Sequence, residues 1–297
     1  MGFILVNYVL LSPLLFLWGL FITPLSIGLA NRYRILDHPG GRKIHTMVTP
    51  RGAGIVFWLG FLLWALFAAE SIPVLPALTL GVSVVFFSGY WDDMKALNPF
   101  GRFLAHLASA GLFLLFVPMP MGHALVCLFW ITGMTNAYNF IDGANGLCLL
   151  MFIATSCILA LMGGGPLFIP MACLASGILP WNFPRAKTFL GDGGTTPLGY
   201  LLSSLFIYTV APRMPSIPFL TLPFLLLLIG GIPVWDTLFA IVRRLWSGYS
   251  PFHPDRGHIH HRLMDSGLSP FWTVMILTGL QIVVVRLGVF LFTPYAP

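Results

Sequence analysis

Acidic side chains are rare in this chain, in which only nine of 297 residues are Asp or Glu. Asp92 and Asp93 are adjacent at the end of a hydrophobic segment, where the dipole of a helix disfavours negative charge. We therefore expect this pair to have a cationic partner. Magnesium accepts such hard oxygen ligands and usually shares them with substrate phosphates. The alternative is a solvated helix end whose charges are balanced by Lys95 and Arg102.

Amide and carboxylate side chains recur every third residue in the segment TNAYNFIDGANGL. Asn136, Asn139 and Asp142 could therefore share one face of a helix. Gly143 and Gly146 permit a sharp turn and a close approach of the backbone to a ligand. Such a group suits the recognition of a base or sugar, or the positioning of a metal ion. A capped break between two helices is the alternative interpretation.

Asp192 lies among glycines in the segment FLGDGGTT. Either Asp192 or Thr195 could cap the helix that follows, and the N-terminus of that helix would bind an anion. A capping Asp is common, so this segment alone is weak support for a site. Together with the Asp92–Asp93 pair, however, it offers a third hard oxygen ligand.

Three imidazoles and two guanidiniums fall within seven residues near the C-terminal end, at His258, His260, His261, Arg256 and Arg262. Closely spaced histidines could bind a transition metal. The flanking arginines would repel a metal cation and favour a phosphate instead. We expect this segment to hold a phosphorylated ligand.

A second basic segment lies between residues 31 and 52. Its cations and glycine-rich backbone could bind phosphates. Contact of a basic stretch with anionic lipid headgroups is equally open. The residues concerned are Arg32, Arg34, His38, Arg42, Lys43, His45 and Arg51.

The surrounding sequence is that of a membrane protein. Hydrophobic residues make up 58% of the chain and charged residues 8%, and the mean hydropathy is +0.90. Soluble proteins have about 45–50% and about 25%. A soluble domain, a disordered chain and a nucleic-acid-binding module are therefore excluded. The net charge of +6 arises from few acids rather than many bases, so it does not imply a nucleic-acid partner.

The length of the apolar runs predicts helices rather than barrel strands, since a helix needs about 20 apolar residues to cross the hydrocarbon. We expect an all-α integral membrane protein, one domain over residues 1–297, with about ten transmembrane helices. The predicted spans are 3–30, 53–69, 72–90, 103–119, 121–137, 147–162, 166–181, 196–212, 217–238 and 270–293.

The charges predict the orientation of these spans. Thirteen of the 15 Lys and Arg residues lie in the loops that follow odd-numbered spans, which the positive-inside rule places in the cytoplasm. Both termini then face outward, and the polar clusters share the cytoplasmic face. The spans contain almost no ionisable groups near the midplane, which argues against a coupled transporter. We expect an enzyme that acts on a membrane-bound substrate.

The motifs NAYNFIDGANGL, FLGDGGTT and PDRGHIHHRL, in this order, resemble the polyprenyl-phosphate N-acetylhexosamine-1-phosphate transferases. This family includes MraY, WecA and TagO, and the histidine motif is most similar to the WecA-like branch. The resemblance runs from Asp37 to Leu263 and covers all five predicted cytoplasmic loops. The predicted topology, with ten spans and both termini outside, agrees with the architecture of the family.

The resemblance implies a magnesium-dependent transfer, with Mn²⁺ as a substitute metal, at the bacterial inner membrane. An N-acetylhexosamine-1-phosphate, with GlcNAc favoured, would pass from a UDP-sugar to undecaprenyl phosphate. UMP would leave, and the lipid-linked sugar would prime a cell-envelope glycan such as lipopolysaccharide. Members of this family often form homodimers, so the resemblance also implies a homodimer.

The family's functional residues carry over by position. Asp192 would be the principal Mg²⁺ ligand, and Asp92 and Asp93 would bind metal or lipid phosphate, one of them as a base. Whether a carboxylate acts as a covalent nucleophile stays open. Substrate would be bound by Lys43, Asn136, Asn139, Asp142 and Arg256, with His258, His260 and His261 as catalytic groups at the phosphate or sugar.

Two departures from the family pattern blur the choice of sugar. Ala96 stands where some members have a third acid, and Asn145 stands where many have a second Asp. An MraY-type enzyme that takes UDP-MurNAc-pentapeptide is one alternative. A membrane protein that binds polyprenyl phosphate without turnover is the other.

Overall fold

The computed structural model describes residues 2–39, 47–68, 72–251, 253 and 255–293, with side chains from residue 11 onward. Its long helices are α1 (Gly2–Arg32), α2 (Ala53–Ala68), α3 (Leu75–Met94), α4 (Pro99–Leu114), α5 (Met121–Ile141), α6 (Leu147–Leu159), α7 (Gly165–Ile178), α8 (Asp192–Val210), α9 (Leu222–Trp246) and α11 (Pro270–Phe292). The shorter elements are β1 (Leu36–Asp37), β2 (Thr49–Pro50) and α10 (Ile259–Asp265). A π-turn covers Ala160–Gly164, and 3₁₀ turns cover Leu179–Trp181 and Ala211–Ser216.

The structure confirms an all-α membrane protein. A long helix overlaps each of the ten predicted spans. Five segments of the described chain are long and apolar enough to cross a membrane by length and composition: Leu11–Arg32, Met121–Ile141, Leu147–Trp181, Leu222–Trp246 and Pro270–Phe292. The count of ten membrane crossings and their orientation stay predictions.

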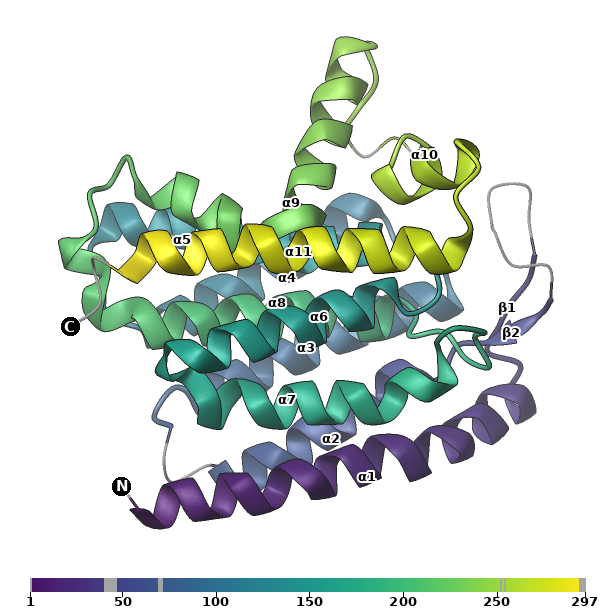
Figure 1. The fold of residues 1–297 in the computed structure, drawn as a ribbon, viewed down its shortest axis with the longest axis horizontal. Helices are drawn as coiled ribbons and strands as arrows, with labels where there is room; N and C mark the ends of the chain where they lie inside the picture. Colours follow the sequence, from purple (N-terminus) through teal and green to yellow (C-terminus); the bar gives the residue numbers. More distant parts are fainter. Residues whose placement is uncertain (1, 40–46, 69–71, 252, 254, 294–297) are drawn as a thin grey trace.

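The longest of these apolar segments is a helical hairpin. Gly163 has a φ of 91°, in the left-handed region that an L side chain rarely adopts, and the chain reverses there. As a result α6 and α7 pack against each other, and α7 also packs along α1 (Figure 1). The two predicted spans in this region are therefore separate helices.

Helix α8 lies at the centre of the bundle, against α3, α5 and α2 (Figure 1). It is buried along almost its whole length. Gly193 and Gly199 allow the backbones of α3 and α5, respectively, to approach α8 closely. Its N-terminus opens at the polar end of the molecule and positions Asp192 there.

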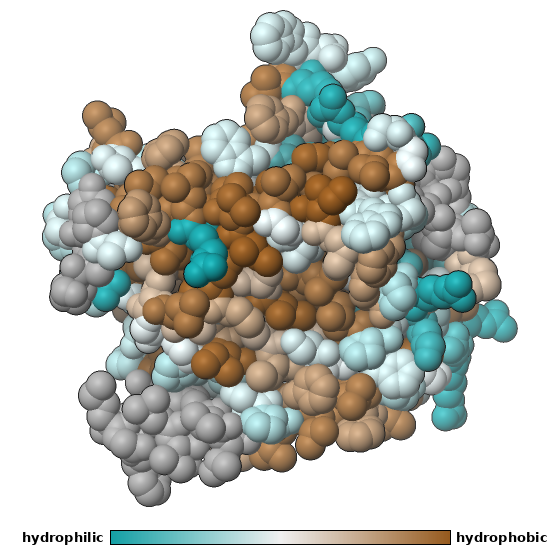
Figure 2. All heavy atoms as spheres, viewed as in Figure 1, coloured by the Kyte–Doolittle hydropathy of each residue, from teal (hydrophilic) through white to brown (hydrophobic). Residues whose placement is uncertain are grey.

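Polar groups gather at one end of the bundle. Figure 2 shows a mainly hydrophobic surface over the bundle and hydrophilic side chains near β1, β2 and α10. The strands β1 and β2 pair antiparallel, with Asp37 opposite Thr49. Arg51, directly after β2, forms a parallel bridge with Phe189, which ties the first polar segment to the loop before α8.

The helices extend further into the polar end than the sequence indicates. Helix α3 continues to Met94 and α5 to Ile141, so Asp92, Asp93 and Asn139 lie in the last turns of helices rather than in loops. The segment 239–269, predicted as a loop, contains the end of α9 and the short helix α10. The second half of α9 projects away from the bundle in Figure 1.

Candidate functional site

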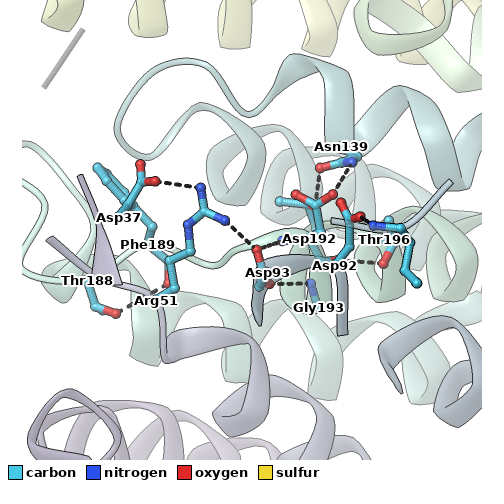
Figure 3. A network of polar contacts seen from close by, with 12 residues as sticks. Asp37, Arg51, Asp92, Asp93, Asn139, Thr188, Phe189, Asp192, Gly193 and Thr196 are labelled. Carbon is cyan, nitrogen blue, oxygen red and sulfur yellow. Dashed lines mark hydrogen bonds and ion pairs between the residues drawn. The ribbon is translucent and has the colours of Figure 1, made fainter. Parts of the chain in front are cut away.

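Asp93 caps the N-terminus of α8. Its Oδ1 accepts a hydrogen bond from the backbone N–H of Asp192 at 3.0 Å, and its Oδ2 accepts one from Gly193 at 3.0 Å (Figure 3). Gly191, just before the helix, has a φ of 68° and leaves room for this carboxylate, which a Cβ would meet. The expectation that Asp192 or Thr195 caps this helix is wrong, because a side chain from α3 occupies the capping position.

Arg51 connects Asp93 to the first polar segment. Its guanidinium donates to Asp93 Oδ1 at 2.9 Å and to Asp37 Oδ1 at 2.6 Å. The Asp93 side chain is only 3% exposed, so its charge depends on Arg51 and the two backbone N–H groups for compensation. Asp93 therefore holds the start of α8 and the guanidinium of Arg51 in place.

Arg102, in α4, joins the two other carboxylates. Its Nη1 donates to Asp92 Oδ2 and, at 2.5 Å, to Asp192 Oδ2. Asn139 Nδ2 donates to the same Asp192 oxygen at 3.0 Å, and Asn139 Oδ1 accepts from Thr195 at 3.0 Å. We call Asp92, Asp93 and Asp192 the acid cluster. The cationic partners of the acid cluster are therefore arginines, and one of them, Arg102, is the partner that the alternative interpretation of the Asp92–Asp93 pair names.

A cavity of about 470 Å³ opens beside the acid cluster. Its walls combine carboxylates, side-chain amides, one guanidinium and one imidazole. The lining residues are Asp37, Arg51, Asn139, Asp142, Gly143, Ala144, Asn145, Asn182, Pro184, Phe189, Gly191, Asp192, His261 and Pro270. They come from four separate polar segments and from the start of α11, so the fold itself assembles this cavity.

Two carboxylates at the cavity are held in surroundings that disfavour their charge. Burial, followed by the negative charges of Asp192 and Asp93, raises the pKa of Asp142 to about 7. Burial and the charge of Asp93 likewise raise the pKa of Asp192 to about 7, although Arg102 acts in the opposite direction. A cation bound beside these carboxylates would favour their charged forms.

The donor chemistry of these residues fits a magnesium ion. No group of three His, Cys, Asp or Glu side chains with metal-binding geometry occurs in the part of the chain that the structure describes. Magnesium does not require such a group, because it is usually held by one or two carboxylates together with waters and substrate phosphates. The Oδ2 atoms of Asp92 and Asp192 already share one cationic group, that of Arg102.

Residues 255–265, which we call the histidine loop, lie beside the cavity. His258 Nδ1 lies 2.7 Å from Asp236 Oδ2, and the backbone N–H of Ile259 donates to Asp236 Oδ1 at 2.8 Å. His260 is 1% exposed and lies directly against Gly143. Burial, followed by the neighbouring His261 and His258, lowers the pKa of His260 to about 3, so its ring is neutral at pH 7. Of the three histidines, His261 lines the cavity.

The start of the histidine loop is clamped to the end of α9. Asp255 accepts hydrogen bonds from Arg243 at 2.9 and 3.0 Å and from Arg244 at 2.9 Å. Burial acts to raise the pKa of Asp255, but the bonds from Arg244, the Gly257 N–H and Arg243 prevail and lower it to about 2. The position of the histidine loop therefore depends on the position of the end of α9.

The structure brings together most of the predicted site residues. Asn139, Asp142, Asp192 and His261 line the cavity, and the acid pair Asp92–Asp93 adjoins it through Arg102 and Arg51. His258 and His260 lie behind this wall, each buried.

Two other predicted residues, Asn136 and Arg256, are not among those that line the cavity. Asn136 donates to the carbonyl of Thr132 in its own helix. Arg256 is about half exposed and faces Asp265 at 3.9 Å, and Lys43 lies outside the described residues.

Sequence reasoning did not assign Asp37 and Asn182 to the site, although both line the cavity. It named Arg51, which also lines the cavity, only as one cation of a segment that could bind phosphates or lipid headgroups. Asn182 also accepts a hydrogen bond from the backbone N–H of Gly146. No local spacing indicates these long-range pairings. Asp236 had a usable signal, because it is the single carboxylate in the predicted span 217–238, and an acid within an apolar span is a candidate functional residue.

Comparison with known proteins is consistent with this geometry. A family model described as glycosyl transferase family 4 matches residues 75–210, which contain the acid cluster. The chain is 33% identical over 282 residues to a probable undecaprenyl-phosphate N-acetylglucosaminyl 1-phosphate transferase of Bacillus subtilis, covering 87% of this chain and 77% of the relative.

Two further relatives have related names. A decaprenyl-phosphate N-acetylglucosaminephosphotransferase of Mycobacterium leprae is 30% identical, over 86% of this chain and 77% of its own length. An undecaprenyl-phosphate alpha-N-acetylglucosaminyl 1-phosphate transferase of Salmonella typhi is 30% identical, over 93% of this chain and 81% of its own. Each of these similarities extends over more than four fifths of the chain.

Proposed function

This chain belongs to the polyprenyl-phosphate N-acetylglucosamine-1-phosphate transferases, and on that basis we propose that it uses a UDP-sugar as donor and works at the cytoplasmic face of the bacterial inner membrane. It is an enzyme that transfers GlcNAc-1-phosphate to a polyprenyl phosphate. The observation that carries the proposal is a cavity with amides, a guanidinium and carboxylates at the polar end of an apolar bundle.

The composition of the cavity walls supports a nucleotide-sugar donor. A volume of about 470 Å³ lies within the usual range of small-molecule sites, about 300–1,000 Å³. Asn139, Asn145 and Asn182 provide amide groups that can pair with a base or with sugar hydroxyls. Arg51, whose Nη1 and Nη2 are bonded to Asp93 and Asp37, adds a positive charge to the cavity wall that attracts a phosphate.

The charges of the site suit an acceptor that carries a phosphate. A lipid phosphate must approach a diphosphate, so neutralising negative charge dominates the barrier to transfer. Arg102 and Arg51 lie next to the acid cluster and can take part in that neutralisation. The bundle end is also where a lipid tail can stay in hydrocarbon while its phosphate meets a water-soluble nucleotide.

The three carboxylates of the acid cluster have different environments, from which we propose different roles. Asp192 and Asp92 would hold Mg²⁺, or Mn²⁺ in its place. When bound, this metal supplies charge neutralisation and a template for the two phosphates. Asp92 is also our candidate for the base at the lipid phosphate. Asp93 is committed to the α8 cap and to Arg51, and we propose that it positions the site.

The measurement that tests this function is UMP release by the purified protein in detergent. It requires undecaprenyl phosphate, Mg²⁺ and a panel of UDP-GlcNAc, UDP-GalNAc and UDP-MurNAc-pentapeptide. We expect lipid-dependent UMP with UDP-GlcNAc that disappears on addition of EDTA. The variant Asp192→Ala, which lacks a proposed metal ligand that lines the cavity, should release little UMP under the same conditions.

Two outcomes would redirect the proposal. Preferred use of UDP-MurNAc-pentapeptide would support the MraY-type alternative. Absence of UMP with every donor, in a folded preparation that binds lipid phosphate, would support the alternative of a non-catalytic binding protein. The expected homodimer stays a prediction. The mass of the protein part of the protein–detergent complex can check it.

Placement in the membrane is part of the same proposal. The Lys and Arg bias of the loops supports ten spans with both termini outside and the cavity in the cytoplasm. Labelling of single cysteines introduced at the two ends of the bundle, in sealed inverted vesicles, would check this orientation. These vesicles expose the cytoplasmic face, so a cysteine at the cavity end that stays unlabelled by an impermeant reagent would contradict it.

A further inference from the structure

Helix α9 is broken inside the bundle. Gly231 has φ 60° and ψ −147°, so the helix stops there and restarts in a new direction. Pro233, two residues later, has no N–H, so it adds no donor that would need a partner at the break. The N–H of Ile232 remains, and in an apolar region an unsatisfied backbone donor is costly.

Gln281 of α11 satisfies this donor. Its Oε1 accepts the hydrogen bond from Ile232 at 2.7 Å, and its Nε2 donates to Thr155 Oγ1 of α6 at 2.9 Å. Both Gln281 and Thr155 are 0% exposed. A fully buried amide in an apolar helix is expensive unless it is paired. Here one side chain links the break in α9 to two other helices.

The segment after the break carries the contact with the histidine loop. Asp236 lies five residues beyond Gly231 and holds both the ring of His258 and the N–H of Ile259. That N–H belongs to the first residue of α10, the helix that contains His260 and His261. His261 lines the cavity, and His260 packs against Gly143 of the cavity wall. The direction of α9 after its break therefore sets where these groups lie.

We propose that Gln281 is a positioning residue of the transfer reaction: by fixing the break in α9 at Gly231 it places Asp236, and Asp236 places the histidine loop at the cavity. The proposal rests on the assignment of this cavity to the UDP-sugar. Gln281 is not among the residues that line the cavity, and its two side-chain hydrogen bonds go to Ile232 and Thr155, so the proposed effect on the donor passes through Asp236.

Replacement of Gln281 separates positioning from a purely structural role. Gln281→Leu removes the acceptor at a similar size. We expect the KM for UDP-GlcNAc to rise and kcat/KM to fall about tenfold. Gln281→Glu, protonated in these apolar surroundings, keeps an acceptor and a donor and should stay within about threefold of the parent protein. A purely structural role would reduce the yield of active enzyme without changing KM.

Thr278→Val is the matched control. Thr278 lies one turn before Gln281 in α11, is buried, and its Oγ1 makes no hydrogen bond with any residue that the structure describes. This change also replaces a polar group by an apolar one, but it leaves the break in α9 intact. We expect KM and kcat within about twofold of the parent protein.

A double-mutant cycle with Asp236→Asn tests the route of the effect. If Gln281 acts through Asp236, the double variant Q281L/D236N should lose no more than about threefold beyond D236N alone. A double variant that loses the product of the two single effects would overturn the proposal, as would Q281L with an unchanged KM. Absence of UMP from the parent protein would instead count against the proposed function.

A variant that fails to fold can be distinguished from one that folds but holds the histidine loop in the wrong place. If Q281L does not yield folded protein, Gln281→Asn replaces it, since its amide is one methylene too short to reach Ile232 while it keeps the polarity. The same rise in KM is expected. If neither variant folds while T278V does, Gln281 is needed for folding alone and the proposal is wrong.

Discussion

The acid cluster and the histidine loop flank the same cavity but are supported in different ways. The acid cluster is fixed by helix ends within the bundle, where Asp93 holds the first turn of α8 and Arg102 joins Asp92 to Asp192. The histidine loop is attached mainly to the second half of α9, through Asp236 and Asp255. We infer that the first region sets the chemistry and the second adjusts how the donor is held.

The largest effect is expected from Asp192→Asn. Loss of the carboxylate that faces both the cavity and Arg102 should lower kcat on the order of 1,000-fold, as expected for loss of transition-state charge stabilisation. Because its crowded surroundings disfavour the charged form, the neutral side chain should leave the thermal midpoint unchanged or raise it. UMP release and thermal unfolding in detergent measure the two effects. A lower midpoint with near-normal turnover would reverse the assigned role.

Asp93→Asn should combine a loss of activity with a loss of stability. The substitution weakens the cap of α8 and the ion pair with Arg51, and loss of a helix cap costs about 1 kcal/mol. We expect a lower thermal midpoint and a fall in kcat of roughly 30-fold, since Asp192 is displaced with the start of α8. If Asp93→Asn lowered activity as much as Asp192→Asn without changing stability, Asp93 would be a direct participant instead.

Asp236→Asn should affect donor binding more than the chemical step. His258 and Ile259 lose the carboxylate that holds them, so the KM for UDP-GlcNAc should rise about tenfold with a smaller change in kcat. Steady-state kinetics with varied UDP-GlcNAc at saturating undecaprenyl phosphate would measure this. A fall in kcat alone would show that the two regions do not differ in the way we infer.

The smallest effect is expected from pH on the requirement for magnesium. Asp142 and Asp192 have pKa values raised to about 7 without a bound cation, so each is increasingly protonated below pH 7. Protons on Asp192 then compete with Mg²⁺, and its half-saturating concentration should rise about fivefold between pH 8 and about pH 6.3. Titration of UMP release with Mg²⁺ at fixed pH values measures this. A requirement that weakens at low pH would contradict it.

The sequence predicted the fold class and much of the site, because these depend on local patterns. Runs of apolar residues showed where the ten long helices lie, and the glycine-flanked Asp192 and the Asn139–Asp142 spacing identified residues that do line the cavity. Asn136, about one turn before Asn139 in α5, is not among the residues that line the cavity. Its amide reaches the carbonyl of Thr132, an option that every Asn inside a helix has and that spacing cannot exclude.

The number and types of the polar side chains, and their gathering at one end of the helices, were thus determined by the sequence alone, since hydrocarbon admits few of them elsewhere. Only the tertiary structure decided which carboxylate caps α8, which histidine lines the cavity, and that Gln281 closes the break in α9. These pairings join residues between 22 and 100 positions apart, such as His258 with Asp236 and Gly193 with Asp93. Sequence spacing specifies geometry over one or two helical turns, whereas packing of whole helices sets contacts across such separations.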